Sequence, residues 1–261
     1  MNIAFYSAST GMISQQAGMD VTANNVANLN TVGYKALRPS FADCIYTEQR
    51  RTEAEWDTGH GQLLNKTDFM WEIGGFTDTS QPLDFALPND GFFMVRDYMG
   101  NDYLTRDGDF EITDIGEDDQ YGNNIWQLVN CNGDFVLDYE GNHINVPFVK
   151  ETDEDGNPTD IDSTVIDYVA LKDMIGVYTV PNNWGLAQDD SNHFLITERS
   201  GQAVADEERE LDKLQYYLER SSVDLAEEMV NIIIEQRSYQ LDAKIVQTAD
   251  EMQQIANNIR N

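Results

Sequence analysis

The sequence predicts an α+β protein. In this fold an N-terminal and a C-terminal helix form a coiled-coil-like core, and a mostly antiparallel β domain lies between them. At both ends of the chain, apolar residues recur every three or four positions, as in a helical seam. Between the ends, apolar runs are short and bounded by turn residues, as in antiparallel strands. The 261 residues are 41% hydrophobic, which is enough for a real core in one or two domains.

Residues 1–35 are predicted to contain the N-terminal assembly helix, from residue 3 to residue 28. Asn28, Asn30 and Gly33 mark its end because these residues tolerate left-handed backbone. Asp20 is the only charged side chain before residue 35, so we expect protein to cover both faces, partly from other subunits. An ordinary core helix is the alternative. The predicted stripe consists of Phe5, Ala8, Met12, Gln15, Met19, Thr22, Val26 and Leu29.

Residues 221–261 are predicted to form a second assembly helix, which no Pro or Gly interrupts after residue 222. Ser221 and Asp224 resemble a capping box, and acids in the first turn suit the helix dipole. Neither terminal helix can bury its stripe alone, so the two are expected to pack together. The predicted stripe consists of Leu225, Met229, Ile232, Gln236, Tyr239, Ala243, Val246, Ala249, Met252, Ala256 and Ile259.

The middle of the chain is predicted to be a β-rich outer domain from residue 80 to 202. Asn132-Gly133 is a strong hairpin signal between two apolar runs, and Glu140-Gly141-Asn142 marks the next turn. The flanks, 36–79 and 203–220, are polar and weakly patterned. We therefore predict that they are extended connectors between the β domain and the two helices.

The chain is strongly acidic, with 16 Lys and Arg against 47 Asp and Glu, a net charge of −31. This charge excludes a main surface that binds nucleic acid or an anionic membrane. No apolar run is long enough to insert in a membrane, and residues 1–34 lack the pattern of a cleaved signal peptide. Residues 1–34 carry −1 and residues 221–261 carry −4. Copies of the chain should therefore meet through their termini and point the acidic middle outward.

The sequence indicates no catalytic residue, no cofactor and no metal site. His60, His143 and His193 lie far apart, and no nucleophile elbow, phosphate loop or Cys/His cluster is present. Residues 151–162 carry acids at EF-hand-like positions, but Glu151 in first place and Pro158 at position eight favour a solvated acidic loop. Cys44 and Cys131 are expected to be unpaired.

Three ordered motif blocks resemble the flagellar rod and hook proteins of bacteria. Residues 23–35 read ANNVANLNTVGYK, which is similar to the N-terminal signature of that family. The middle block consists of QPLDFA at 81–86, DGFF at 90–93 and YLTRDG at 103–108. The C-terminal block consists of LERSSVDLAEEM at 218–229, QRSY at 236–239 and TADEM at 248–252. The chain departs from the family at residues 87–89, where LPN replaces a glycine-bearing link.

The resemblance implies a structural subunit of the flagellar basal-body rod, in a proximal or distal position. Such subunits leave the cell uncleaved through the flagellar type III export apparatus and polymerise with themselves and with other rod and hook subunits. The resulting helical tube lies outside the cytoplasmic membrane, transmits torque from motor to hook, and carries exported substrates. The implied N-terminal assembly residues are Met12, Met19, Asn24, Asn25, Val26, Asn28, Leu29, Asn30, Thr31, Gly33 and Tyr34. The implied C-terminal ones are Leu225, Met229, Ile232, Gln236, Arg237, Tyr239, Val246, Met252 and Ile259.

Two other functions are compatible with the composition. An extracytoplasmic cell-wall glycan hydrolase would use two carboxylates held in a cleft. A calcium-dependent adhesive module would use the acidic loop at 151–162. The three motif blocks favour the rod subunit over both.

Overall fold

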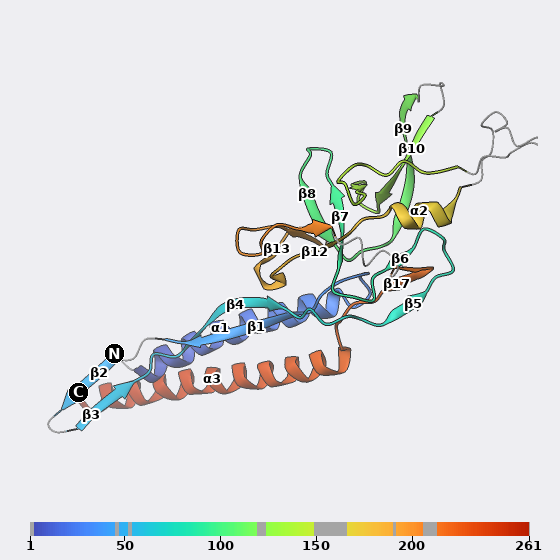
Figure 1. Cartoon of the computed structure of the whole chain (residues 1–261). Helices are drawn as coiled ribbons and strands as arrows, with labels where there is room; N and C mark the ends of the chain where they lie inside the picture. The colour runs from blue at the N-terminus through green and yellow to red at the C-terminus, as the bar shows by residue number, and fades with distance from the viewer. Residues whose placement is uncertain are drawn as a thin grey trace, which may run out of the picture. The chain divides into compact units, whose positions relative to one another are not determined.

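The computed structural model describes residues 3–44, 47–51, 54–118, 124–148, 166–189, 192–205 and 213–260. The chain divides into two compact units. The helix unit comprises residues up to 29, residues 35–70 and residues from 223 onward, and the β unit comprises residues 30–34 and 71–222. The predicted α+β class, with terminal helices and a central antiparallel sheet, is confirmed (Figure 1).

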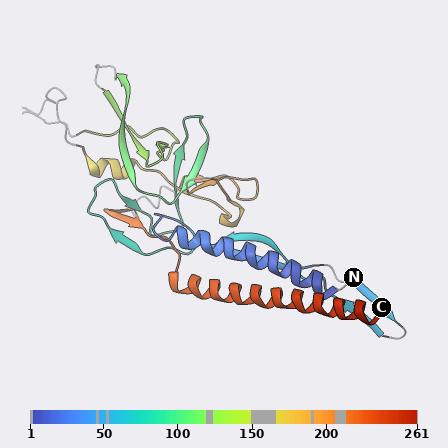
Figure 2. The same ribbon diagram turned by 180° about the vertical axis from the view of Figure 1, so that it is seen from behind.

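The helix unit contains two long helices and two antiparallel strand pairs. Figure 2 shows the N-terminal helix in blue lying along the C-terminal helix in red. Strand β1 pairs with β4 and packs with it on α1, while β2 pairs with β3. The segment 36–79, predicted to be an extended connector, thus contributes paired strands to this unit. The elements are α1 (Ile3–Ala27), β1 (Leu37–Asp43), β2 (Thr47–Arg51), β3 (Ala54–Thr58), β4 (Gln62–Phe69) and α3 (Leu225–Arg260).

Helix α3 begins three residues later than the capping-box pattern suggested. Asp224, rather than Ser221, caps it, since Asp224 Oδ1 accepts the backbone N–H of Ala226 at 2.8 Å. The first hydrogen bond of the helix runs from the N–H of Glu228 to the carbonyl of Asp224 at 3.0 Å. A carboxylate at this position satisfies an otherwise unpaired N–H and favours the positive end of the helix dipole.

The β unit is built around a nine-stranded antiparallel sheet. Along the sheet the strands follow the order β13, β14, β8, β7, β11, β10 and β9, and β12 pairs with both β7 and β15. The sheet strands are β7 (Phe92–Arg96), β8 (Asp102–Thr105), β9 (Phe110–Asp118), β10 (Asn124–Asn130), β11 (Phe135–Val136), β12 (Val177–Thr179), β13 (Ala187–Gln188), β14 (His193–Leu195) and β15 (Val204–Ala205).

The other elements of the β unit are short. Two small strand pairs join segments far apart in the sequence, β5 with β17 and β6 with β16. Strands β15, β16 and β17 fall in the segment 203–220, which was predicted to be a connector. These elements are β5 (Phe76–Asp78), β6 (Phe85–Ala86), α2 (Tyr168–Met174), the 3₁₀ turn η1 (Asn183–Gly185), β16 (Leu214–Gln215) and β17 (Tyr217–Glu219).

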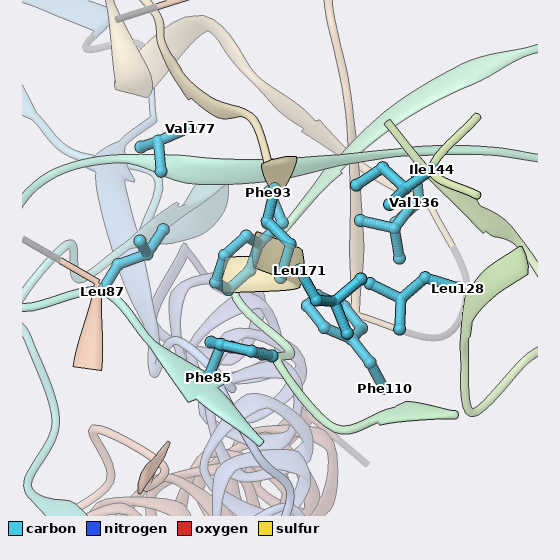
Figure 3. Packing of buried hydrophobic residues seen from close by; sticks show 11 residues of the cluster. Phe85, Leu87, Phe93, Phe110, Leu128, Val136, Ile144, Leu171 and Val177 are labelled. Carbon is cyan, nitrogen blue, oxygen red and sulfur yellow. The ribbon is translucent and has the colours of Figure 1, made fainter. Parts of the chain in front are cut away.

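One apolar core holds the β unit together. Figure 3 shows side chains from β6, β7, β9, β10 and α2 pointing toward one another. The rings of Phe93 and Phe110 meet edge to face with centroids 5.2 Å apart. Apolar burial of this kind drives folding at roughly 25 cal/mol per Å². The core consists of Phe85, Leu87, Phe93, Val95, Phe110, Leu128, Val136, Ile144, Leu171, Ile175 and Val177.

Both predicted turns of the middle domain are present. Val129 pairs with Phe135 across the Asn132-Gly133 turn, where Gly133 has a φ of +89°. At the next turn, the N–H of Asp138 donates to the carbonyl of Asn142 at 2.9 Å. Helix α2 was not predicted, because a seven-residue helix is too short to show a clear period. The acidic loop proposed at 151–162 lies outside the described residues.

Candidate assembly interface

Helices α1 and α3 pack along each other in opposite directions through small and polar side chains. On α3 only Glu235 and Ala249 are buried among the described residues. Faces of this composition bury little apolar area, so the contact gains little hydrophobic stabilisation. The buried residues of α1 are Ala8, Gly11, Ser14, Gly18, Thr22 and Asn25.

Asn25 connects three elements of the helix unit. Its Nδ2 donates to the carbonyl of Leu37 and to Glu228 Oε1, both at 2.8 Å. Its Oδ1 accepts the N–H of Leu37, also at 2.8 Å. Because Asn25 is buried and its amide is fully used, it fixes α1 against both β1 and α3.

Two carboxylates of α3 lie over glycines of α1. A Cβ added to Gly18 would lie 2.9 Å from Glu235 Oε1, and one added to Gly11 would lie 2.6 Å from Asp242 Oδ2. Thr22 Oγ1 donates toward both oxygens of Glu235, at 3.4 and 3.3 Å. The missing Cβ atoms let the carboxylates approach the α1 backbone closely. We call this row of contacts, together with Asn25–Glu228, the inner seam.

Burial changes the acidity of the inner seam. It raises the pKa of Asp242 above its usual value of 3.8. Burial also raises the pKa of Glu235 above 4.5, and the carboxylate of Glu228 adds to that rise. The hydrogen bond from Thr22 opposes the rise at Glu235. Both carboxyl groups therefore hold their protons more tightly in the folded protein than in the unfolded chain.

The predicted N-terminal stripe is rotated relative to the contact face of α1. Ala8 and Thr22 lie on that face, whereas Phe5 is 41% exposed. The close approach at Gly11 and Gly18 leaves room only for small side chains, so the larger ones flank the contact. Four large members of the stripe are half-buried: Met12, Met19, Val26 and Leu29. Their role in assembly stays a prediction.

The other predicted N-terminal residues lie at and beyond the end of α1. Asn28 Nδ2 donates to the carbonyl and to the Oδ1 of Asn24 at 2.9 and 2.8 Å, which closes the last turn. Asn30 is exposed and Thr31 is half-buried, while Gly33 and Tyr34 are buried in the β unit.

The predicted C-terminal stripe runs along one flank of the contact face of α3. Only Ile232, Ala243 and Val246 are half-buried, and Ala249 alone is buried. The exposed members of the predicted assembly set are Leu225, Met229, Gln236, Arg237, Tyr239, Met252 and Ile259. Most of the predicted assembly side chains of α3 are thus not used within the subunit.

A second apolar stripe on α3 was not predicted as such. Its members are separated by steps of four, seven, four, seven, three and four residues, which is a heptad pattern. They are between 44% and 80% exposed. At about 100° per residue, the stripe lies roughly 110° around the helix from the inner seam. We call it the outer stripe: Val230, Ile234, Leu241, Ile245, Met252, Ile255 and Ile259.

The outer stripe is a candidate interaction surface. Apolar side chains aligned over the length of a helix form a continuous patch, and such patches mark protein interaction sites. The helix therefore presents its polar side to α1 and leaves its heptad-spaced apolar side unoccupied in the isolated subunit. The heptad steps in the sequence were the signal that could have identified this stripe.

In the β unit, the segment that follows α1 lies beside the segment that precedes α3. The N–H of Gly33 donates to the carbonyl of Glu219 at 2.8 Å, and that of Ser222 donates to the carbonyl of Tyr34 at 3.0 Å. Gly33 has a φ of +65°, and an added Cβ would lie 2.6 Å from the carbonyl carbon of Arg106. Only glycine fits there without strain, which explains this position of the motif.

A buried ion pair supports these two segments. Arg106 Nη1 lies 3.2 Å from Glu219 Oε2, and the two side chains are 2% and 1% exposed. Arg106 also donates to the carbonyl of Leu87 at 3.2 Å, and Glu219 Oε1 accepts the N–H of Gly74 at 3.0 Å. The ion pair therefore connects four separate stretches of the chain, those around Gly74, Leu87, Arg106 and Glu219.

Beside Arg106, the carboxyl group of Asp107 is a weaker acid than an aspartate in water. Burial raises its pKa to about 6, and the carboxylates of Asp109 and Asp84 add to the rise. The N–H of Asp109 at 3.1 Å and the thiol of Cys131 at 3.7 Å donate to it and oppose the rise. The structure records Cys131 as a free thiol, and Cys44 as well.

We expect Asp107→Asn to stabilise the protein at neutral pH. Because the folded pKa lies above the unfolded value of 3.8, a stabilisation present in acid is lost as the pH rises through about 6. The loss amounts to on the order of 2–3 kcal/mol. Urea unfolding, followed by tryptophan fluorescence, should give the variant a larger free energy of unfolding than the wild type at pH 7.5. Near pH 4 the two free energies should be equal. An equal difference at both pH values would contradict this assignment.

The described residues show no arrangement typical of catalysis. No group of three His, Cys, Asp or Glu side chains in that part of the chain is placed to hold a metal ion. His193 stacks on Tyr103 and lies 3.5 Å from Asp134, and burial lowers its pKa. His143 stacks on Phe135, and burial lowers its pKa too. Of the helices described, none combines the length and apolar character needed to cross a membrane.

Family models match both ends of the chain. Residues 5–35 match the model described as flagella basal body rod protein, and residues 214–259 match the C-terminal model of the flagellar basal body rod FlgEFG proteins. The chain is 33% identical to the flagellar basal-body rod protein FlgG of Borreliella burgdorferi, over 98% of each chain. The chain belongs to the family of flagellar basal-body rod proteins. It is therefore a structural protein of the flagellar basal body.

Further relatives agree with this assignment. The FlgG protein of Buchnera aphidicola subsp. Baizongia pistaciae is 31% identical, over 96% of this chain and 97% of the relative. The flagellar hook-basal body complex protein FlhP of Bacillus subtilis is 28% identical, over 97% of each chain. In this rod protein the matched segments contain almost all of α1 and of α3, the two helices that form the inner seam, and α3 also presents the outer stripe.

Proposed function

We propose that this rod protein polymerises through its terminal helices, with copies of itself and with other rod and hook subunits. The product is a helical tube that transmits torque from the motor to the hook and carries exported substrates through its lumen. The observation that supports this proposal is the outer stripe of α3, whose seven apolar side chains are at least 44% exposed in the subunit.

Burial of the outer stripe supplies the driving force. A fully buried Leu, Ile or Met side chain contributes about 1.5–3 kcal/mol relative to an exposed one. Because the stripe repeats along one helix, the gain accumulates at each subunit contact. A heterologous contact repeated around a rotation that does not close produces a filament rather than a ring.

Charge favours the same arrangement. The helical ends carry −5 of the net charge of −31, so the acidic middle of the chain repels its copies most strongly. Assembly through α1 and α3 keeps the weakly charged segments at the contacts and leaves the acidic surface outside.

The export route and the absence of catalysis are also part of the proposal. As a basal-body rod protein, the chain would pass through the flagellar type III export apparatus to reach a position outside the cytoplasmic membrane. Its role would need no cofactor and no enzyme activity. The relatives carry the names of rod and hook-basal body proteins, which favours this role over a hydrolase or an adhesive module.

Site-specific photo-cross-linking tests the proposal. A photoreactive residue at Leu241, in the outer stripe, should form adducts between subunits in isolated basal bodies. The control is Met99, a 68% exposed side chain of the β unit, which should give at least about tenfold fewer adducts of this kind because the proposal leaves the acidic β unit outside the contacts. Adducts confined to single chains at Leu241 would overturn the proposal.

A further inference from the structure

The inner seam combines two sets of residues with the same seven-residue spacing. On α3 the carboxylates are Glu228, Glu235 and Asp242, and on α1 the residues opposite them are Asn25, Gly18 and Gly11. Because 3.6 residues make one turn, a spacing of seven keeps each set on one face of its helix. The antiparallel pair thus places three acids, one every two turns, against the backbone or an amide of α1.

No positive charge compensates these acids in the described part of the helix unit. Glu228 receives hydrogen bonds from Asn25 and Asn231, Glu235 receives one from Thr22, and Asp242 only approaches Gly11. No described ion pair includes any of the three, and Lys66 of β4 pairs with Asp68. The remaining charged groups on the packed elements are Asp20 on α1, Lys35, Arg38 and Asp43 near or on β1, and Glu227, Arg237, Lys244, Asp250 and Glu251 on α3.

We propose that the inner seam is a pH-sensitive switch that sets how tightly α1 and α3 pair within one subunit. With Glu235 and Asp242 protonated, the helices pack closely through uncharged contacts at Gly18 and Gly11. With both groups ionised, like charges lie along one partly desolvated seam, and the pairing is weak. Neutral pH therefore weakens the pairing of the two helices within the isolated subunit.

The direction of the effect follows from burial. Desolvation disfavours the charged form of Glu235 and of Asp242, and repulsion from Glu228 adds to this at Glu235. For an acid whose folded pKa is raised, the stabilisation is complete below the unfolded pKa and is lost as the pH rises through the folded one. The helix pair should therefore become less stable from about pH 4 upward.

Gly11 and Gly18 are part of this pH-sensitive switch. At Gly18 and Gly11 the carboxylate oxygens come within 2.9 and 2.6 Å of where a Cβ would be. Larger residues would hold the carboxylates farther out, in water, where a charge costs little. The close approach at each glycine therefore couples the helix contact to the ionisation of the carboxyl group opposite it.

The test compares the wild-type protein and two variants at two pH values. The seam variant is Glu235→Gln with Asp242→Asn. The control variant is Asp250→Asn with Glu251→Gln, which makes the same change in charge at two exposed positions of the same helix. Thermal unfolding is followed by the helical circular dichroism signal, at pH 4.5 and 7.5, on protein shown by sedimentation to be monomeric. Hydrogen exchange of α1 peptides reports the pairing directly.

At pH 7.5 the seam variant should melt about 3 °C or more above the control variant, and its α1 amides should exchange more slowly. At pH 4.5 the two variants should differ by less than half of that amount. Equal melting temperatures at pH 7.5, or a difference that persists at pH 4.5, would overturn the proposal. The experiment uses monomers, so its outcome is independent of cross-linking at the outer stripe, which tests polymerisation itself.

Discussion

Leu241→Asp is expected to abolish rod assembly and motility while leaving the subunit folded. Leu241 is 64% exposed in the isolated subunit, so an aspartate there is hydrated and costs the monomer little. In the assembled tube the same carboxylate would be buried without a partner, which costs several kcal/mol per contact. We expect association to weaken by at least roughly 100-fold. Complementation of a strain lacking the gene, with soft-agar swimming as readout, measures the effect.

The matched control is Met99→Asp in the β unit, at a side chain that is 68% exposed. It adds the same charge at an apolar position of similar exposure and should leave swimming close to wild type. Met252→Asp, a second change in the outer stripe, should reproduce the loss. Normal swimming of the Leu241→Asp strain would exclude the outer stripe as an assembly contact.

Arg106→Met is expected to give the largest loss of stability in the β unit. It leaves the carboxylate of Glu219 buried at 1% exposure without its counter-charge. Removing one partner of a buried ion pair costs about 3–5 kcal/mol. For a chain of this size the melting temperature should fall by roughly 6–20 °C. Calorimetry or circular dichroism of the purified protein measures the fall.

Two controls separate the buried charge from lost packing. The double variant Arg106→Met with Glu219→Gln removes both charges and keeps an acceptor for the N–H of Gly74, so it should recover at least about half of the loss. Lys66→Met breaks an exposed ion pair, with Lys66 59% exposed, and should change stability by less than about 1 kcal/mol. A double variant no more stable than Arg106→Met would show that packing, not charge, dominates.

The long elements could be predicted because their patterns are local and repeated. The helix predicted at residues 3–28 is α1 (Ile3–Ala27), and the one predicted at 221–261 is α3 (Leu225–Arg260). The turns at Gly133 and Gly141 were found because each occurs where a two-residue period is interrupted by residues that accept positive φ. The motif blocks pointed to the rod family, and the matched relatives confirm it.

The pairing of β1 with β4 and of β2 with β3 could not be predicted. Strand pairing depends on residues distant in sequence, and the seven residues of β1, LRPSFAD, show no clear alternation of apolar and polar side chains. The buried ion pair was equally hidden, since Arg106 and Glu219 are 113 positions apart and each looks like an ordinary surface residue in sequence.

The sequence by itself determined that both ends of this protein are long helices with heptad-like spacing and that the middle is an acidic, antiparallel β domain. Only the tertiary structure decided which face of each helix is used within the subunit. Gly11 and Gly18 bring α1 so close to α3 that carboxylates, rather than leucines or isoleucines, occupy the contact. A hydrophobic period shows that a helix has an apolar side, but close approach of two backbones is set by the smallest residues. For that reason the apolar side of α3 faces away from α1, where a second chain can cover it.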